Sequence, residues 1–297
     1  MTFDIFLQHL TNGISLGSLY ALIAIGYTMV YGILRLINFA HGDIFMMATY
    51  FGFFGVMTFG IPWFIVFPLV LILTALLGMG VEVTAYRPLR DAPKISILIS
   101  SIGASFLLEN LTTVLFGGVP KPFPTPDIFT DVVPVGTVSI QKLTFYIPVV
   151  TGICLVGLLY LINRTKTGMA MRAVSRDHET ARVMGVNVDR TISLTFGIGS
   201  LLAAVGGIMW GMKFPQIAPL MGVMPGLKCF IAAVIGGIGN VSGAVIGGFI
   251  LGIGEIMLVA FLPTLTGYRD AFAFVLLIVI LLYKPTGIMG EKIAEKV

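Results

Sequence analysis

The sequence predicts an all-α, polytopic integral membrane protein that crosses the bilayer about eight times and carries one cytoplasmic surface helix. Of its 297 residues, 57% are hydrophobic and only 11% are charged. The mean hydropathy is +1.01, whereas soluble domains are about half apolar and about a quarter charged. Several apolar runs exceed the roughly 18 residues that a membrane-spanning helix needs. The few charges gather in the connections between these runs, as expected for a membrane protein.

The predicted spans follow one another with short connections. No linker is long enough to separate domains, so residues 1–297 are expected to form a single membrane domain. The N-terminus has no basic region and no small-residue cleavage site, which indicates that its first apolar run is structural. The long runs cover approximately 11–34, 42–60, 63–86, 95–117, 143–163, 190–212, 242–262 and 269–283, and a shorter glycine-rich run covers 226–238.

The basic connections predict the orientation of the chain. Residues 87–94, residues 164–190 and the tail with Lys284, Lys292 and Lys296 are expected in the cytoplasm. The 118–142 connection has balanced charge and many Pro and β-branched residues, which indicates an external loop. An even number of crossings must then separate 164–190 from the tail, so the short run at 226–238 is needed as a ninth crossing, and the N-terminus lies outside.

About 13 residues span only about 20 Å as a helix, which is less than the roughly 30 Å hydrocarbon thickness. A discontinuous helix bent at "GGIGNVSG" (236–243) would resolve this shortfall. Irregular backbone at membrane depth survives only inside protein or beside a watery cavity.

A second interruption, "INFAHGD" (37–43), separates the first two spans. Each interruption has an asparagine followed shortly by a glycine, and paired breaks can mark repeats around a transport pathway, although chance similarity is an equal alternative. His41 has either a proton-relay or substrate role or a structural hydrogen bond. The pathway or hinge candidates are Asn38, His41, Gly42 and Asp43 in the first break and Gly239, Asn240 and Gly243 in the second.

Two carboxylates lie within predicted spans. Glu255 is deep in 242–262, where a carboxylate is costly unless it faces protein or water, so it is a pathway candidate with structural pairing as the alternative. Glu109 is expected to reach the interface at the end of its span. Small residues spaced by four, such as Gly243 and Gly247, favour close helix packing over a role in the pathway.

Enzymatic and metal-binding functions have little support in the sequence. There is no GxxxxGK[ST] phosphate loop, so the chain is expected to bind no cofactor and to leave any ATP hydrolysis to other subunits. Three scattered histidines do not suggest a metal site, and basic residues confined to connections do not suggest nucleic-acid binding. The absence of an acidic ladder across the spans argues against a proton- or sodium-driven carrier.

The 164–190 connection holds nine charges, six basic and three acidic. A helix is expected to begin at Thr167–Gly168 and to end near Gly185, with Ala170, Ala173, Val174, Ala181 and Met184 near one face. Such a helix either rests on lipid headgroups or docks into a groove of another protein, and its mixed charge favours docking. The candidates for this role are Gly168, Arg172, Arg176, Asp177, Glu179, Arg182 and Gly185.

Three stretches resemble one family. "GISLGSLYALIAIGYTMVYGILRLINFAHGDIFMMATY", "TGMAMRAVSRDHETARVMGVNVDR" and "AAVIGGIGNVSGAVIGGFILG" are similar, in this order, to LivH-type permease subunits of bacterial branched-chain amino-acid ABC transporters. The resemblance implies an inner-membrane importer for Leu, Ile and Val, with a coupling helix at about 168–185 that docks on an ATPase. It also implies a homologous LivM-type permease, two ATPase subunits and a periplasmic binding protein. The alternatives are a permease for urea, short amides or another small solute, or a self-sufficient secondary transporter.

Overall fold

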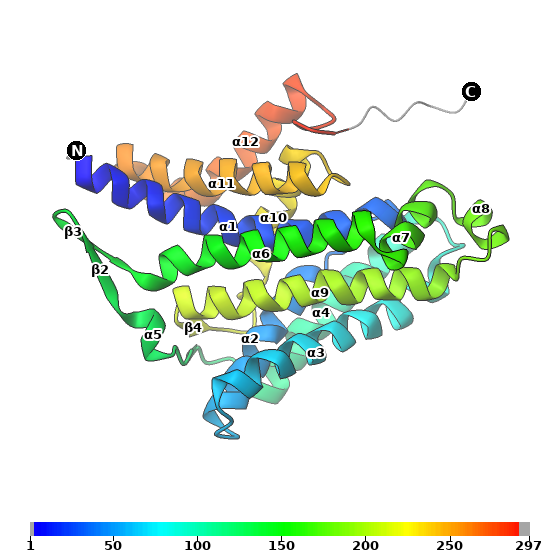
Figure 1. Cartoon of the computed structure of the whole chain (residues 1–297), viewed down its shortest axis with the longest axis horizontal. Coiled ribbons are helices and arrows are strands. Elements are labelled where there is room, and N and C mark those ends of the chain that lie inside the picture. The colour runs from blue at the N-terminus through cyan, green and yellow to red at the C-terminus, as the bar shows by residue number, and fades with distance from the viewer. Residues whose placement is uncertain (1–2, 291–297) are drawn as a thin grey trace.

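The computed structural model describes residues 3–290 and confirms a predominantly helical membrane protein (Figure 1). Seven segments in this range are long and apolar enough to cross a membrane. They are α1 (Phe3–Leu34), α3 (Trp63–Val81) with its extension to Leu89, α4 (Lys94–Phe116), α6 (Lys142–Arg164), α9 (Val188–Lys213), α11 (Val241–Phe261), and α12 (Arg269–Tyr283) with the preceding 3₁₀ turn η3 (Pro263–Tyr268). Two further apolar helices are shorter: α2 (His41–Met57) has 17 residues and α10 (Val223–Gly236) has 14.

The remaining elements lie at the two ends of this bundle (Figure 1). A π-helical turn, η1 (Glu82–Tyr86), and a 3₁₀ turn, η2 (Arg87–Leu89), extend α3, while α7 (Lys166–Arg176) and α8 (His178–Val183) follow α6. At the opposite end lie α5 (Asp127–Thr130), the hairpin β2 (Val132–Val135) and β3 (Val138–Gln141), and the paired strands β1 (Lys121–Pro122) and β4 (Gln216–Ile217).

The charged connections gather at one end of the bundle, in agreement with the predicted orientation. Arg90 in the 87–94 connection pairs with Asp189 at the start of α9, beside α7 and α8. At the other end, the Thr137 hydroxyl donates to Asp4 Oδ2 at 2.7 Å and ties the β2–β3 hairpin to the start of α1. These ends are called inner and outer below. Lys292 and Lys296 of the predicted cytoplasmic tail lie outside the described residues.

Helix α1 forms the centre of the bundle and packs antiparallel to α11 through glycines. A Cβ on Gly17 would lie 2.9 Å from the Phe249 Cα, and a Cβ on Gly248 would lie 2.5 Å from the Ala21 nitrogen. Because no side chain separates the two backbones, the helices approach as closely as small residues allow in membranes. The small residues of α11 therefore allow close helix packing, as their spacing of four residues predicted.

The 236–243 segment is a turn between two antiparallel helices, so the prediction of one discontinuous helix bent there is wrong. Gly237 and Gly239 have φ values of +108° and +96°, which glycine adopts without strain, and they reverse the chain. The Asn240 side chain then accepts the Gly243 N–H at 3.0 Å and caps α11. Gly247 lies against the Ala232 carbonyl, so α10 and α11 run back side by side.

The irregular backbone that precedes α10 lies at 214–222. Strand β4 at the outer end pairs with β1, and the chain then enters the bundle, where Gly222 lies against Gly42 at the start of α2. From there α10, about 21 Å long, leads to the inner end beside residues 289–290. Residues 214–236 thus run from the outer end to the inner end of the bundle, with the break in front of the short helix rather than behind it.

Candidate transport site

The short helices α2 and α10 begin next to each other inside the bundle. A Cβ on Gly42 would lie 2.6 Å from the Gly222 carbonyl oxygen, and a Cβ on Gly226 would lie 3.0 Å from the Gly42 Cα. Neither helix has a side-chain cap at its N-cap residue, Ala40 or Gly222. Since the first turn of a helix carries partial positive charge, two such positive ends meet in the interior of this protein.

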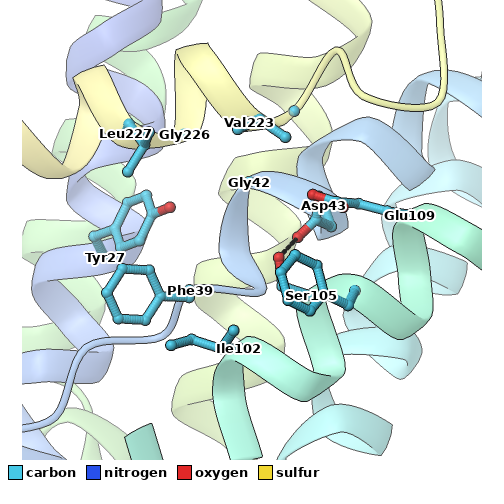
Figure 2. A pocket seen from close by; sticks show the side chains of 12 residues that line it. Tyr27, Phe39, Gly42, Asp43, Ile102, Ser105, Glu109, Val223, Gly226 and Leu227 are labelled. Carbon is cyan, nitrogen blue, oxygen red and sulfur yellow. Dashed lines mark hydrogen bonds between the residues drawn. The ribbon is translucent and has the colours of Figure 1, made fainter. Parts of the chain in front are cut away.

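A cavity of about 180 Å³ lies at this meeting point, between α1, α2, α4 and α10 (Figure 2). Its apolar wall is formed mainly by Phe39, Ile102, Phe106 and Leu227, beside the ring of Tyr27. Val223 and Gly226 place the start of α10 on its upper side in the view of Figure 2, and Gly222 also lines the cavity. Small-molecule sites typically combine such apolar walls with a few polar groups.

The polar groups of the cavity are two carboxylates and a hydroxyl. Asp43 is 2% exposed and Glu109 is 9% exposed, and the two lie next to each other in Figure 2. The Ser105 hydroxyl donates to Asp43 Oδ2 at 2.5 Å, while Asp43 Oδ1 has no hydrogen-bond partner. None of the twelve lining residues is Lys, Arg or His. The cavity therefore holds acidic groups that none of its own lining residues neutralises.

The structure brings only part of the first predicted break to this cavity. Gly42 and Asp43 line it, whereas Asn38 and His41 are buried behind it. Asn38 Oδ1 accepts a 2.9 Å hydrogen bond from Tyr86, and the His41 ring packs edge-on against Tyr27 with centroids 4.5 Å apart. Packing thus fixes the loop between α1 and α2, and the first turn of α2 presents Asp43 to the cavity.

The second predicted break does not meet the first. Gly239 and Asn240 line a different cavity of about 530 Å³ at the inner end, together with Arg35, Arg172 and Arg176. Gly243 packs against Gly236 in the α10–α11 turn. Instead, the 214–222 segment contacts the first break, through Gly222 and Gly42. The shared asparagine and glycine residues of the two predicted breaks did not indicate this contact.

Glu255 is fully buried in a cluster of ion pairs. This is the structural pairing that the sequence analysis gave as the alternative to a pathway role. Lys228 Nζ lies 2.5 Å from Glu255 Oε1, and Arg269 Nε lies 3.1 Å from Oε2. Tyr20 donates to Oε2 at 2.9 Å, and Lys228 also pairs with Asp270 at 2.6 Å. The cluster joins α1, α10, α11 and the start of α12.

Sequence reasoning missed two buried charged groups, Lys228 and Glu82, and misplaced a third, Glu109. Lys228 interrupts the apolar run at 226–238, and a lysine inside a span is costly unless it is paired. Glu109 was expected to reach the interface, but it faces the cavity. Glu82 of η1 is fully buried in the inner half of the bundle. It forms an ion pair with Arg90 and accepts a hydrogen bond from the Ser193 hydroxyl, and so joins the extension of α3 to α9.

The coupling segment consists of two helices, so the expectation of one helix from Gly168 to Gly185 is wrong. Thr165 caps α7 by accepting the Gly168 N–H at 3.1 Å. Asp177 ends α7 and caps α8 by accepting the N–H groups of Glu179 and Thr180 at 2.9 and 3.1 Å. Competition between an N-cap aspartate and the continuing helix explains the break.

The predicted apolar face of the segment is confirmed except at Met184. Val174 and Ala181 are buried and Ala170 and Ala173 are half-buried, whereas Met184 is 77% exposed. Met171 is also buried, and Val183 is 86% exposed. Arg172 donates to the Ile162 carbonyl and anchors α7 to α6. Arg176, Glu179 and Arg182 are exposed, and Gly185 ends the segment with a φ of +83°.

The amino-acid sequence of this bundle matches a known family along almost all of its length. The family described as "branched-chain amino acid transport system / permease component" matches residues 9–281. The chain belongs to this permease family. It is therefore a multi-pass membrane permease of an ABC importer rather than an enzyme, and other subunits complete its transport system.

Relatives of this permease extend over its full length. It is 42% identical to the high-affinity branched-chain amino acid transport system permease protein LivH of Escherichia coli K12, and 41% identical to BraD of Pseudomonas aeruginosa, with 98% of each chain covered in both cases. It is 27% identical to a probable LivH of Methanocaldococcus jannaschii, over 95% of this chain and 91% of the relative.

The bundle itself is similar to a solved structure, PsaBC from Streptococcus pneumoniae in complex with Fab. The TM-score is 0.51 at 13% sequence identity, and the match covers 96% of this chain and 94% of the other. At this identity the likeness concerns the fold alone.

Proposed function

We propose that the permease passes Leu, Ile and Val across the inner membrane as the LivH-type half of a branched-chain amino acid importer. A homologous LivM-type permease forms the other half of the pathway, two separate ATPase subunits hydrolyse ATP, and a periplasmic binding protein delivers the substrate. The observation that carries this proposal is the identity of 41–42% over 98% of both chains with two permeases that are named for high-affinity branched-chain amino acid transport.

The pathway in this proposal runs past the α2–α10 cavity. Gly42 and Asp43 line it, with Asn38 and His41 holding the loop in place. Gly239, Asn240 and Gly243 form a hinge at the inner end, where Asn240 Nδ2 donates to the Met289 carbonyl at 3.1 Å. Glu255 holds α10 through Lys228 and so positions the pathway indirectly.

Helices α7 and α8 form the coupling element. They connect α6 directly to α9, and α9 packs against α1, α2 and α3. A movement of α8 by the ATPases is therefore passed to the helices that surround the cavity. Gly168, Arg172 and Asp177 maintain the shape of this element, while Arg176, Glu179, Arg182 and the residues before Gly185 present its outer surface.

Uptake of radiolabelled leucine by vesicles that contain the complete complex tests the proposal. Internal ATP and external binding protein are each supplied or omitted, and unlabelled amino acids or urea compete. We expect uptake only when both are present, and competition by Ile and Val but not by urea. Leucine uptake that needs neither ATP nor the binding protein would instead identify a self-sufficient secondary transporter.

The exposed end of α8 gives a specific prediction for coupling. The double variant Val183→Asp/Met184→Asp is expected to lose copurification of the ATPase subunits and at least about tenfold of ATP-dependent leucine uptake, because apolar side chains at the centre of an interface carry much of its affinity. The unfolding temperature of the permease should not change, since both side chains are exposed.

A matched control is Val132→Asp in β2, which is 57% exposed at the outer end. Normal uptake and normal ATPase binding are expected for this variant. If the α8 double variant retained its ATPase subunits and its uptake, α8 would be a helix that lies on the lipid surface.

A further inference from the structure

The α2–α10 cavity contains an unbalanced charge. Asp43 and Glu109 are next to each other on one wall, and no basic residue occurs among the twelve lining residues (Figure 2). The basic groups Lys228 and Arg269 are engaged with Glu255, and Arg90 is engaged with Glu82 and Asp189. Carboxylates inside a membrane protein are costly unless they are paired, so this pair favours a cationic group in the cavity.

The free Oδ1 atom of Asp43 also favours a cationic group in the cavity. Ser105 satisfies Oδ2 at 2.5 Å, but Oδ1 has no partner although the residue is 98% buried. Buried polar atoms in folded proteins are almost always hydrogen-bonded, and exceptions deserve an explanation. An ammonium group has three donors and fits an acceptor that is free beside a second carboxylate.

The side of the cavity formed by α10 has the opposite character. Gly222 and Val223 place the start of this helix at the cavity, and no side chain caps it at its N-cap. In this first turn the Val223 N–H donates to the Leu220 carbonyl at 3.2 Å and Pro225 has no N–H, so the attraction for a carboxylate comes mainly from the helix dipole. Short helices that begin within transporters use this property for anionic substrate groups. Gly226 allows the close approach, because a side chain there would meet Gly42.

The rest of the cavity suits an apolar side chain of moderate size. Phe39, Ile102 and Leu227 supply the wall that remains between the two polar sides. The volume of about 180 Å³ is somewhat larger than the roughly 150 Å³ apolar cavity that holds benzene in another protein. A small amino acid with an aliphatic side chain is of this size.

We propose that this cavity is a binding site within the membrane for the zwitterionic head of an aliphatic amino acid. The Asp43–Glu109 pair binds the α-ammonium group, the start of α10 binds the α-carboxylate, and the apolar wall receives the side chain. This inference rests on the proposed function and deepens it, because it assigns a recognition step to the permease in addition to the external binding protein.

The test uses the complete permease–ATPase complex in lipid nanodiscs, without nucleotide and without the binding protein. Binding of tritiated leucine is measured, and unlabelled leucine, leucinamide and 4-methylpentanoate compete. Leucinamide lacks the carboxylate and 4-methylpentanoate lacks the ammonium group. For the wild type we expect strong competition by leucine, weaker competition by leucinamide, and almost none by 4-methylpentanoate.

Asp43→Asn is expected to weaken leucine binding by about tenfold to a hundredfold, the range for loss of a charge-assisted hydrogen bond. The variant should also lose the discrimination between leucine and 4-methylpentanoate, which a purely structural defect would not produce. Glu109→Gln is the second variant, in case Asp43→Asn does not fold. Asp131→Asn, an exposed carboxylate at the outer end, is the matched control and should bind leucine normally.

The outcomes separate this inference from the proposed function. If the wild type imports leucine with ATP and the binding protein, but Asp43→Asn and Glu109→Gln bind and discriminate as the wild type does, the zwitterion site is wrong and the proposed function stands. Tighter binding of 4-methylpentanoate than of leucinamide by the wild type would overturn the assignment of the two polar sides. If the wild-type complex imports no leucine at all, the proposed function itself fails.

Discussion

Glu255→Ala is expected to lower the free energy of unfolding of the purified permease by about 3–5 kcal/mol, the cost of breaking a buried ion pair by removing one partner. Without Glu255, the ammonium of Lys228 and the guanidinium of Arg269 remain close together, and Asp270 is the only carboxylate that contacts Lys228 within residues 3–290. Denaturant unfolding of the permease in detergent, followed by Trp fluorescence, measures this change.

The double variant Lys228→Met/Glu255→Leu provides the comparison. Apolar side chains of similar size leave no buried charge between α10 and α11, so most of the lost stability should return. Asp131→Ala removes an exposed pair with Lys142 and should not shift the unfolding curve measurably. If Glu255→Ala unfolded like the wild type and still lost leucine transport, Glu255 would be a pathway residue rather than a structural one.

Gly42→Ala is expected to have the second large effect, on both transport and stability. The added Cβ would lie 2.6 Å from the Gly222 oxygen and 3.2 Å from the Gly226 Cα, and both neighbours are backbone atoms that cannot rotate away. The starts of α2 and α10 must therefore separate, at about 1–3 kcal/mol for overpacking. We expect leucine uptake by the complete complex to fall by at least about tenfold, because the cavity changes shape.

Gly103→Ala is the matched control for this substitution. Gly103 lies inside α4, and no atom is found within 4 Å of its added Cβ. Alanine costs less backbone entropy than glycine in a helix, so stability should stay the same or rise by about 0.5–1 kcal/mol. Equal uptake by the Gly42→Ala and Gly103→Ala variants would show that the contact between the two short helices does not matter for transport.

The helices could be predicted from the sequence because each apolar run carries its own signal. The start of α2 after "INFAHGD" and the end of α10 at Gly236–Gly237 are local features of the same kind. The pairing of α2 with α10 is not local, since it joins residues about 180 positions apart through backbone contacts that no residue pattern records. The break at 214–222 carries two prolines and no asparagine–glycine pair, so a search for similar breaks passed over it.

The polar interior was partly predictable. Asp43 was identified because it stands at a visible interruption, whereas Glu109 lies in an uninterrupted apolar run whose face cannot be assigned without knowing its neighbours. The break in the coupling segment was readable in principle, because Asp177 is a favoured N-cap residue. Its effect depends on whether the capped helix or the continuing helix is more stable, and the tertiary burial of Val174 and Ala181, which contributes to that balance, is not visible in the sequence.

The pairing of β1 with β4 gives the outer loop a mechanical connection to the interior. Lys121 and Pro122 pair with Ile217 and Gln216, and the Phe123 N–H donates to the Pro215 carbonyl at 3.3 Å. Only five residues lie between Ile217 and the first residue of α10. These residues form turns in which the Met221 N–H donates to the Ala218 carbonyl at 3.0 Å and the Val223 N–H donates to the Leu220 carbonyl at 3.2 Å. A displacement of the outer loop is therefore passed to α10 through a short, hydrogen-bonded connection. A protein that lands on the outer surface thereby acts on the wall of an interior cavity without entering the membrane.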